Sequence, residues 1–206
     1  MTLRVSQPEL LLICGSLRAG STNAAALLCA SELARLVAAA AIYERMAALP
    51  HFNPDDDCDP LPEYVADLRA ALAKADAVML STPEYAGGLP GSFKNLLDWT
   101  IGGAGLYEKP VAWINVSAGG GAKDAYAELR RVLERVGALI VERACIDVPV
   151  TRDLVTAAGS ISGEAVRRAI GASLAALIES ARARRASDRI DETLAQPAVL
   201  GAITFR

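Results

Sequence analysis

Apolar and polar positions along the chain follow two alternating patterns. Apolar runs, typical of strands buried on both faces of a parallel sheet, occupy residues 10–14, 41–43 and 77–80, and the largely apolar segments 110–116 and 138–148 predict two more strands. Between these runs, apolar residues recur every three or four positions, which predicts helices at residues 24–39, 62–75, 92–101, 122–136 and 163–186. Strands that alternate with helices predict an α/β fold with a doubly wound, five-stranded parallel sheet. We expect the strand order 2-1-3-4-5.

Length and charge limit the kind of protein this can be. A chain of 206 residues suits one domain with a large core, and we expect that domain to cover residues 1–186. The weakly patterned residues 187–206 are expected to form a C-terminal tail, either loose or docked on a partner subunit. The net charge of −3 argues against nucleic acid or a membrane surface as the main partner. Every apolar run is shorter than the roughly 20 residues that span a bilayer.

The cysteines and the single histidine show no pattern that carries chemistry. Cys14, Cys29, Cys58 and Cys145 have neither C-x-x-C spacing nor a cluster with His51. We therefore expect no metal site and no disulfide framework, as in a reduced cytoplasmic protein. The histidine lies in a polar, proline-flanked stretch without a nucleophile or acid beside it, which predicts a loop residue. No catalytic acid, base or nucleophile is predicted.

Residues 15–23, between the first strand and the first helix, suit a phosphate group. The first N–H groups of a helix are unpaired and its dipole favours an anion there. Arg18 adds a cation that can hold two oxygens at once. The neutral donors of this loop are Ser16, Ser21, Thr22 and Asn23. The loop lacks the lysine of a nucleoside triphosphate site and the glycines of a dinucleotide site, so it suits a terminal monophosphate. The alternative is a set of polar residues that only caps the helix.

Two further loops follow the third and fourth predicted strands. Residues 81–91 contain Pro83, Gly87, Gly88, Pro90 and Gly91, and a loop with unpaired N–H groups suits the polar edge of a flat ring. The alternative is a strand-to-helix turn that binds nothing. Residues 117–121 include three glycines, which allow a ligand to approach the backbone closely. In the expected strand order, all three loops meet at one edge of the sheet. Together they predict a site for a mononucleotide with a flat head.

The motifs in these loops resemble those of a known family. Residues 15–23 match G-S-x-R-x-x-S-x-N, and residues 83–99 resemble P-E-Y-N-x-x-x-P-G-x-L-K-N-x-x-D-W. The chain is thus similar to the NAD(P)H-dependent FMN reductases, flavodoxin-like proteins that include quinone reductases, chromate reductases and azoreductase-like members. The resemblance implies a flavodoxin-like fold and FMN as the cofactor. It also implies hydride transfer from NADPH or NADH through the flavin to quinone-like acceptors, other flat or small acceptors, or free flavin.

The resemblance also implies which residues hold the cofactor. The groups that correspond to the FMN phosphate site are Ser16, Arg18, Ser21, Thr22 and Asn23. Those that border the isoalloxazine ring are Pro83, Glu84, Tyr85 and Ala86. Those of the third loop are Ser117, Gly119 and Gly120. The resemblance further implies a homodimer or homotetramer, and the charge and the short apolar runs of the sequence predict no nucleic-acid or membrane partner.

One departure from the motif leaves other functions open. The family's asparagine after P-E-Y is Ala86 here, which removes a side-chain amide beside the ring. A first alternative is a flavodoxin-type electron carrier for protein partners, although a net charge of −3 does not indicate its usual acidic docking face. A second is a structural or regulatory domain without a cofactor.

Overall fold

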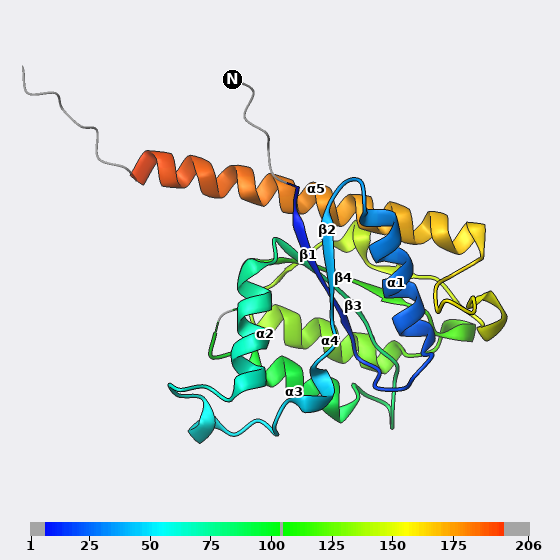
Figure 1. Ribbon diagram of the computed structural model, residues 1–206, viewed down its shortest axis with the longest axis horizontal. Coiled ribbons are helices and arrows are strands. Elements are labelled where there is room, and N and C mark those ends of the chain that lie inside the picture. The colour runs from blue at the N-terminus through cyan, green and yellow to red at the C-terminus, as the bar shows by residue number, and fades with distance from the viewer. Residues whose placement is uncertain (1–6, 104, 196–206) are drawn as a thin grey trace, which may run out of the picture.

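The computed structural model describes residues 7–103 and 105–195, with side chains as far as Arg189 (Figure 1). Its helices and strands, in chain order, are β1 (Glu9–Cys14), α1 (Thr22–Ala34), β2 (Ala39–Tyr43), α2 (Glu63–Lys74), β3 (Ala77–Ser81), α3 (Gly91–Trp99), β4 (Pro110–Asn115), α4 (Lys123–Arg135), β5 (Leu139–Ile140), β6 (Ile146–Asp147) and α5 (Glu164–Ala195).

The strands form one parallel sheet in the order β2-β1-β3-β4-β5, and β6 also pairs with β4. This arrangement confirms the predicted flavodoxin-like order. β1 lies between β2 and β3, and Leu12 is opposite Ile42 on one side and Met79 on the other. β3 then pairs with β4. The chain therefore moves outward in one direction from β1 to β2 and in the opposite direction from β3 onward, as in a doubly wound sheet.

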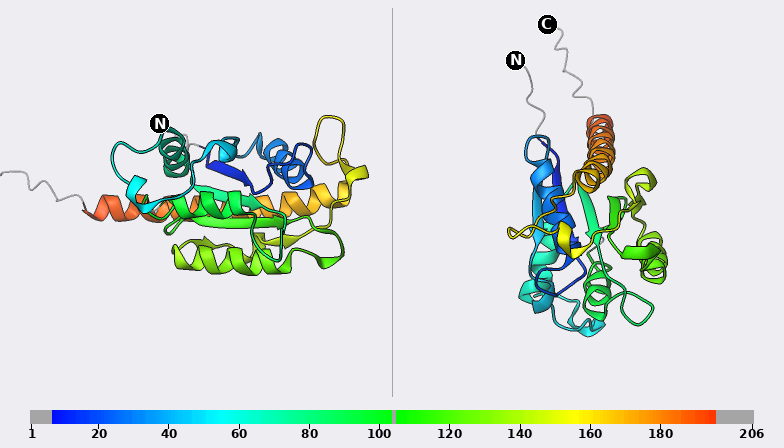
Figure 2. Two further views of the ribbon diagram at one scale, coloured as in Figure 1. Left: turned by 90° about the horizontal axis from the view of Figure 1, so that it is seen from below. Right: turned by 90° about the vertical axis from the view of Figure 1, so that its right-hand side faces the viewer.

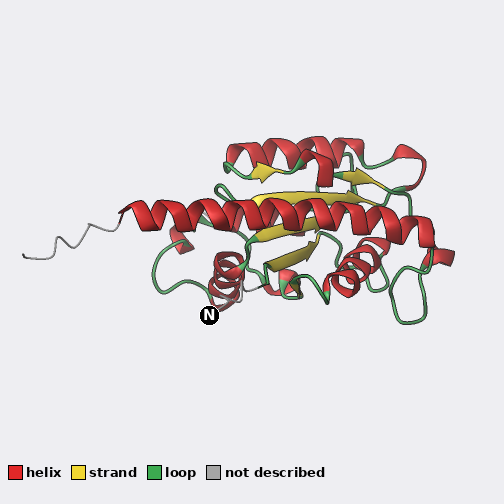
Figure 3. Ribbon diagram, turned by 90° about the horizontal axis from the view of Figure 1, so that it is seen from above, coloured by secondary structure: helices red, strands yellow, loops and turns green. Residues whose placement is uncertain are grey.

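Helices cover both faces of the sheet, which explains why the strands are apolar throughout (Figure 2). Leu10 and Leu12 of β1 belong to the core beneath α1 and α5. Leu11 and Ile13 belong to the core beneath α2, α3 and α4. Figure 3 shows α5 running beside the strands and continuing past the end of the sheet.

Alanine forms much of the core under α1. Ala25, Ala26, Ala30 and Ala34 are all buried there. Small side chains let a helix approach a sheet closely, so the alanine-rich composition reflects close packing rather than a loosely filled interior.

The predicted fifth strand at residues 138–148 is wrong in one respect, because it is interrupted. β5 pairs with the start of β4 and β6 with its end, while Glu142–Ala144 leaves the sheet as a 3-10 turn. The turn brings Glu142 into a bidentate ion pair with Arg130 of α4 and places Arg143 2.9 Å from Glu179 of α5. Two charged residues in the middle of the segment are thus accommodated outside the ladder.

The predicted end of the last helix at residue 186 is also wrong, since α5 continues to Ala195. No proline or glycine occurs between Gly171 and Pro197, and Arg184 pairs with Asp188 one turn further along the helix. Residues 187–195 therefore belong to the helix. Residues 196–206 of the predicted tail lie outside the described residues, so the domain boundary and docking on a partner stay predictions.

Smaller boundaries also differ from the predicted ones, most of all at α1 and β2. α1 begins at Thr22 and ends at Ala34 instead of covering residues 24–39. β2 begins at Ala39, two residues earlier than predicted, because the N–H of Ala39 already bonds to the carbonyl of Pro8.

Within the described part of the chain, no helix is both long and apolar enough to cross a membrane.

Candidate functional site

Three loops follow β1, β3 and β4 at the carboxyl ends of neighbouring strands. We call them loop 1 (residues 15–21), loop 2 (residues 82–90) and loop 3 (residues 116–122). Because these strands are adjacent in the sheet, the loops share one edge of it. Ligands of open α/β sheets bind at this edge, beside the point where the chain changes direction.

Loop 1 begins with a glycine that has no room for a side chain. The N–H of Gly15 bonds to the Ser81 carbonyl at 2.8 Å. A Cβ atom at Gly15 would lie only 2.3 Å from the hydroxyl oxygen of Thr82. Glycine is therefore required for β1 and β3 to deliver their loops side by side.

The rest of loop 1 offers donors without protein acceptors. Within the described residues, the N–H groups of Leu17, Ala19 and Gly20 have no acceptor, and the exposed Arg18 guanidinium makes no hydrogen bond or ion pair. All lie just before the first turn of α1. Free N–H groups, a helix N-terminus and a free guanidinium form the donor set that a phosphate group needs.

Three predicted phosphate residues also have internal partners. The Ser21 hydroxyl caps α1 by accepting from the Asn23 N–H at 3.2 Å, as the capping alternative predicted. The Asn23 side-chain oxygen lies 2.9 Å from the Ser81 hydroxyl at the end of β3. Both residues are buried, and they fix the loop to the sheet. Ser16 is half-buried, and its hydroxyl accepts from the Arg18 N–H. Thr22 is also half-buried and is the first residue of α1.

Loop 2 contains a two-residue hairpin turn. Tyr85 and Gly88 exchange both backbone hydrogen bonds, each 3.1 Å long, around Ala86 and Gly87. Both central residues have positive φ, +50° for Ala86 and +74° for Gly87. These are the angles of a type I′ turn, for which Asn-Gly is strongly preferred. The asparagine that the family motif has here therefore also suits the backbone, a role that the sequence reading missed.

The side chains of loop 2 lie in different environments. Tyr85 is 55% exposed, and Ala86 is exposed beside it. Pro83 and Glu84 are half-buried, and the Glu84 carboxylate accepts from the Ala125 N–H at 3.0 Å. Glu84 therefore contacts α4 with its side chain, and only its backbone lies in the loop.

Loop 3 is shaped by positive φ angles and by Asn115. Gly119 and Gly120 have φ of +65° and +73°, and Ala122 has +61° directly before α4. The Asn115 side chain accepts from the Ser117 N–H at 3.0 Å and donates to the Gly121 carbonyl at 3.1 Å. This one side chain closes the loop. Its signal in the sequence is a lone polar residue at the end of an apolar run.

Tyr126 of α4 connects loop 2 to the sheet. Its hydroxyl accepts from the Thr82 N–H at 3.1 Å and lies 2.8 Å from the Ile114 carbonyl, to which it donates. Burial raises the pKa of Tyr126 well above its usual range, so the phenol stays neutral and keeps the proton that it donates. The sequence predicted an inward-facing residue here but not its hydrogen bonds.

The histidine and the cysteines lie apart from any cluster of metal ligands within the described residues. His51 is exposed in a loop, as predicted. All four cysteines are free. In the part of the chain that is described, no group of three or more potential metal ligands is found.

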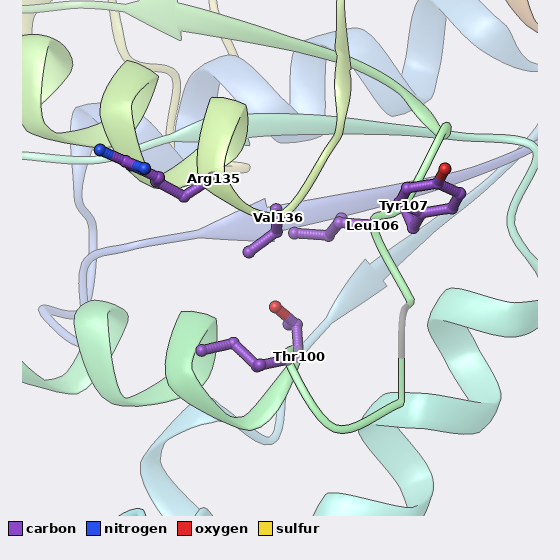
Figure 4. Close-up of a pocket in the computed structure, with 6 residues that line it drawn as sticks. Thr100, Leu106, Tyr107, Arg135 and Val136 are labelled. Carbon is purple, nitrogen blue, oxygen red and sulfur yellow. The ribbon is translucent and has the colours of Figure 1, made fainter.

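An apolar cavity of about 300 Å³ lies away from these loops (Figure 4). Its lining residues are Thr100, Ile101, Leu106, Tyr107, Arg135 and Val136. They come from the ends of α3 and α4 and from the segment that leads into β4. In a parallel α/β fold, these segments are at the amino-terminal edge of the strands, opposite the loops.

The donors of the three loops fit FMN. Loop 1 carries donors that suit a phosphate. Within the described residues, the N–H groups of Ala86, Gly87, Ala118 and Gly119 in loops 2 and 3 also lack acceptors. Free N–H groups of this kind suit the carbonyl and nitrogen edge of a flat heterocycle.

Comparisons with known proteins agree with this fit. Residues 8–149 match the family model described as NADPH-dependent FMN reductase. A subunit named NADH:(hydroxy)cinnamate reductase subunit CrdA, from Vibrio ruber, is 36% identical over 45% of this chain and 46% of its own length, so the chain spans about half of that relative. A 2-hydroxy-1,4-benzoquinone reductase from Burkholderia is 28% identical over 78% of this chain and 88% of its own.

A solved structure extends the likeness to nearly the whole fold. The flavoenzyme FerB from Paracoccus denitrificans, an NAD(P)H:(acceptor) oxidoreductase, superposes with a TM-score of 0.71 at 28% identity, over 85% of this chain and 98% of its own. The matching family model covers well over half of the chain, so the predicted resemblance is confirmed. The chain belongs to the NADPH-dependent FMN reductase family, flavodoxin-like enzymes that use FMN with NAD(P)H as the donor.

Proposed function

We propose that this protein is an NAD(P)H-dependent quinone reductase that uses FMN to pass electrons to quinone-like acceptors, to other flat or small acceptors, or to free flavin. The name of the Burkholderia relative, a benzoquinone reductase, supports a quinone-like acceptor, and the name of FerB supports NAD(P)H as the donor. The observation that carries the proposal is the edge of the sheet where three loops present N–H groups, beside the Arg18 guanidinium, that have no partner among the described residues.

Loop 1 holds the phosphate in this proposal. Arg18 supplies the charge, and the free N–H groups around it supply directed donors at the start of α1. Ser16 and Thr22 contribute hydroxyl groups. Ser21 and Asn23 also keep the loop in place, because their side-chain oxygens accept from the Asn23 N–H and the Ser81 hydroxyl. Accepting a hydrogen bond uses neither the Ser21 O–H nor the Asn23 side-chain amide N–H, so both residues stay donor candidates for the phosphate.

Loops 2 and 3 hold the ring. The segment from Pro83 to Ala86 lies along one side, and Ser117, Gly119 and Gly120 lie along the other. Ala86, Ser117 and the two glycines are small, and the larger Tyr85 is exposed, which leaves room for a flat second substrate. When bound, FMN supplies the hydride chemistry, accepting from NAD(P)H and donating to the acceptor. The protein's part is to bind and orient, and we assign no catalytic residue.

We further propose that the protein works in the cytoplasm as a homodimer or homotetramer, without nucleic-acid or membrane partners. Four free cysteines support a reducing compartment, and the net charge of −3 does not favour polyanions. Closed two-fold symmetry is the commonest arrangement of identical subunits.

Three measurements on the purified protein test the proposal. Its absorbance spectrum should show bound flavin, or should do so after FMN is added. FMN should bind more tightly than riboflavin, because only FMN carries the phosphate. NAD(P)H oxidation should depend on an added quinone. A protein that binds neither flavin, or that binds both with equal affinity, would contradict the assignment of the three loops.

A further inference from the structure

The first turn of α4 receives its cap from loop 2. Ala122, at the N-cap position, has no side chain that could bond the free N–H groups of the helix. Glu84 fills this role from another part of the chain, since its carboxylate accepts from the N–H of Ala125 at 3.0 Å. A carboxylate at a helix N-terminus also interacts favourably with the helix dipole.

A second carboxylate makes the reverse contact, from α4 to loop 2. Glu128 accepts from the Leu89 N–H at 2.8 Å. Leu89 is only 8% exposed, so its N–H would be left without a partner if Glu128 were removed. Gly88 also faces this carboxylate, because a Cβ atom there would lie 2.8 Å from the same oxygen. The backbone of loop 2 therefore comes close to α4 at this point.

These contacts fix the hairpin turn on both sides. Tyr126 holds Thr82 at the start of loop 2, and Glu84 and Glu128 hold the residues on either side of the turn. The turn residues from Tyr85 to Gly87, between these anchors, are exposed. α4 itself begins directly after loop 3. Both loops that border the proposed ring site are thus attached to the same helix.

We propose that Glu128 is a positioning residue for the flavin ring, acting with Glu84 to lock loop 2 onto α4 so that loops 2 and 3 keep a fixed spacing. This inference rests on the proposed function. It assigns Glu84 a different role from the one implied by the family motif, because its side chain acts through α4 rather than on the ring.

The proposal separates the residues that act on the ring from those that act on the phosphate. Loss of the Glu128 contact loosens only loop 2, so FMN and riboflavin should lose affinity by the same factor. Loss of Arg18 should weaken FMN and leave riboflavin unchanged. A purely structural effect on the whole fold would not produce this difference between the two variants.

The test compares Glu128→Ala with Glu128→Gln, because glutamine keeps an oxygen that accepts from the Leu89 N–H while alanine does not. Glu134→Ala is the matched control, since Glu134 is on the same helix, its side chain is 57% exposed, and its nearest ion-pair contact is 4.0 Å away. Dissociation constants for FMN and riboflavin are measured by fluorescence quenching. Hydrogen exchange of the Leu89 amide is followed in the flavin-free protein, and thermal unfolding confirms that each variant is folded.

We expect Glu128→Ala to weaken both flavins by about tenfold or more, the usual effect of leaving a buried donor unpaired. Exchange of the Leu89 amide should accelerate in the same variant. Glu128→Gln should stay within about threefold of the wild type, and the control should be unchanged. Unchanged flavin affinities in Glu128→Ala, or a loss limited to FMN, would overturn the inference.

A second variant tests the same contact from the loop. Gly88→Ala places a methyl group against the Glu128 carboxylate and displaces it, so it should reproduce the equal loss for FMN and riboflavin even if Glu128→Ala does not fold. Wild-type affinities in a folded Gly88→Ala protein would overturn the inference. Failure of the wild-type protein to bind any flavin would contradict the proposed function instead, so the two failures are distinguishable.

Discussion

Replacing Ala86 by asparagine should stabilise the protein, although it adds a polar side chain to an exposed loop. Ala86 has a φ of +50° in the first central position of the type I′ turn in loop 2. The left-handed conformation costs an L residue with a Cβ about 1–2 kcal/mol, and asparagine is one of the few residues that adopt it readily. We therefore expect Ala86→Asn to raise the free energy of unfolding by about 1 kcal/mol.

For a chain of this length, that gain corresponds to an increase in Tm of about 2–4 °C. Ala86→Gly should gain less, about 0.5 kcal/mol, because glycine also makes the unfolded chain more flexible. Ala70→Asn is the control. Ala70 is exposed on α2, where the backbone is right-handed, and asparagine there should cost about 0.5–0.7 kcal/mol.

Thermal unfolding followed by circular dichroism measures all three variants, with and without FMN. Ala86→Asn should raise Tm, whereas Ala70→Asn should lower it. The rise in Tm at Ala86 should appear in the flavin-free protein. If both asparagine variants lower Tm, Ala86 does not have the left-handed backbone conformation. FMN affinity should change by less than about 1.5 kcal/mol, because backbone N–H groups carry the contacts of this loop.

Five further predictions concern the site and the assembly. Arg18→Ala should weaken FMN by about 1.5–3 kcal/mol, the usual value of a charged hydrogen bond, as measured by fluorescence titration. Gly15→Ala should cost about 1–3 kcal/mol in urea unfolding, because its methyl group would overlap Thr82. Stability should fall as the pH rises above about 10, the ordinary pKa of tyrosine. Burial raises the pKa of Tyr126 in the folded state, so unfolding releases a proton there, and Tyr126→Phe should reduce this dependence. Light scattering at micromolar concentration should give the mass of a dimer or tetramer, whereas a monomeric mass would refute the proposed assembly. Steady-state kinetics with quinones of increasing size should show Ala86→Asn slowing the bulky ones most, and an equal change for all would place Ala86 away from the acceptor.

The sequence by itself was sufficient for the fold and the family. Apolar runs such as residues 10–14 and 77–80 contain no polar position, which requires a sheet covered on both faces. The motifs at residues 15–23 and 83–99 then indicated FMN, because phosphate and ring loops are continuous segments at the ends of strands. Patterns of this kind are local, so a single chain displays them without any knowledge of what packs against what.

Only the tertiary structure decided the features that depend on partners far apart in the chain. Glu84 and Ala125 are 41 residues apart, and Glu128 and Leu89 are 39 apart, so no spacing rule relates them. The interrupted fifth strand likewise depends on ion pairs with α4 and α5. The strain at Ala86 was hidden for another reason: alanine has no preference for the left-handed region, so its φ is imposed by the pairing of Tyr85 with Gly88 around it. The spacing of apolar residues along the chain determines which helices and strands form. Hydrogen bonds and ion pairs between packed elements determine how the loops of the site are held in place.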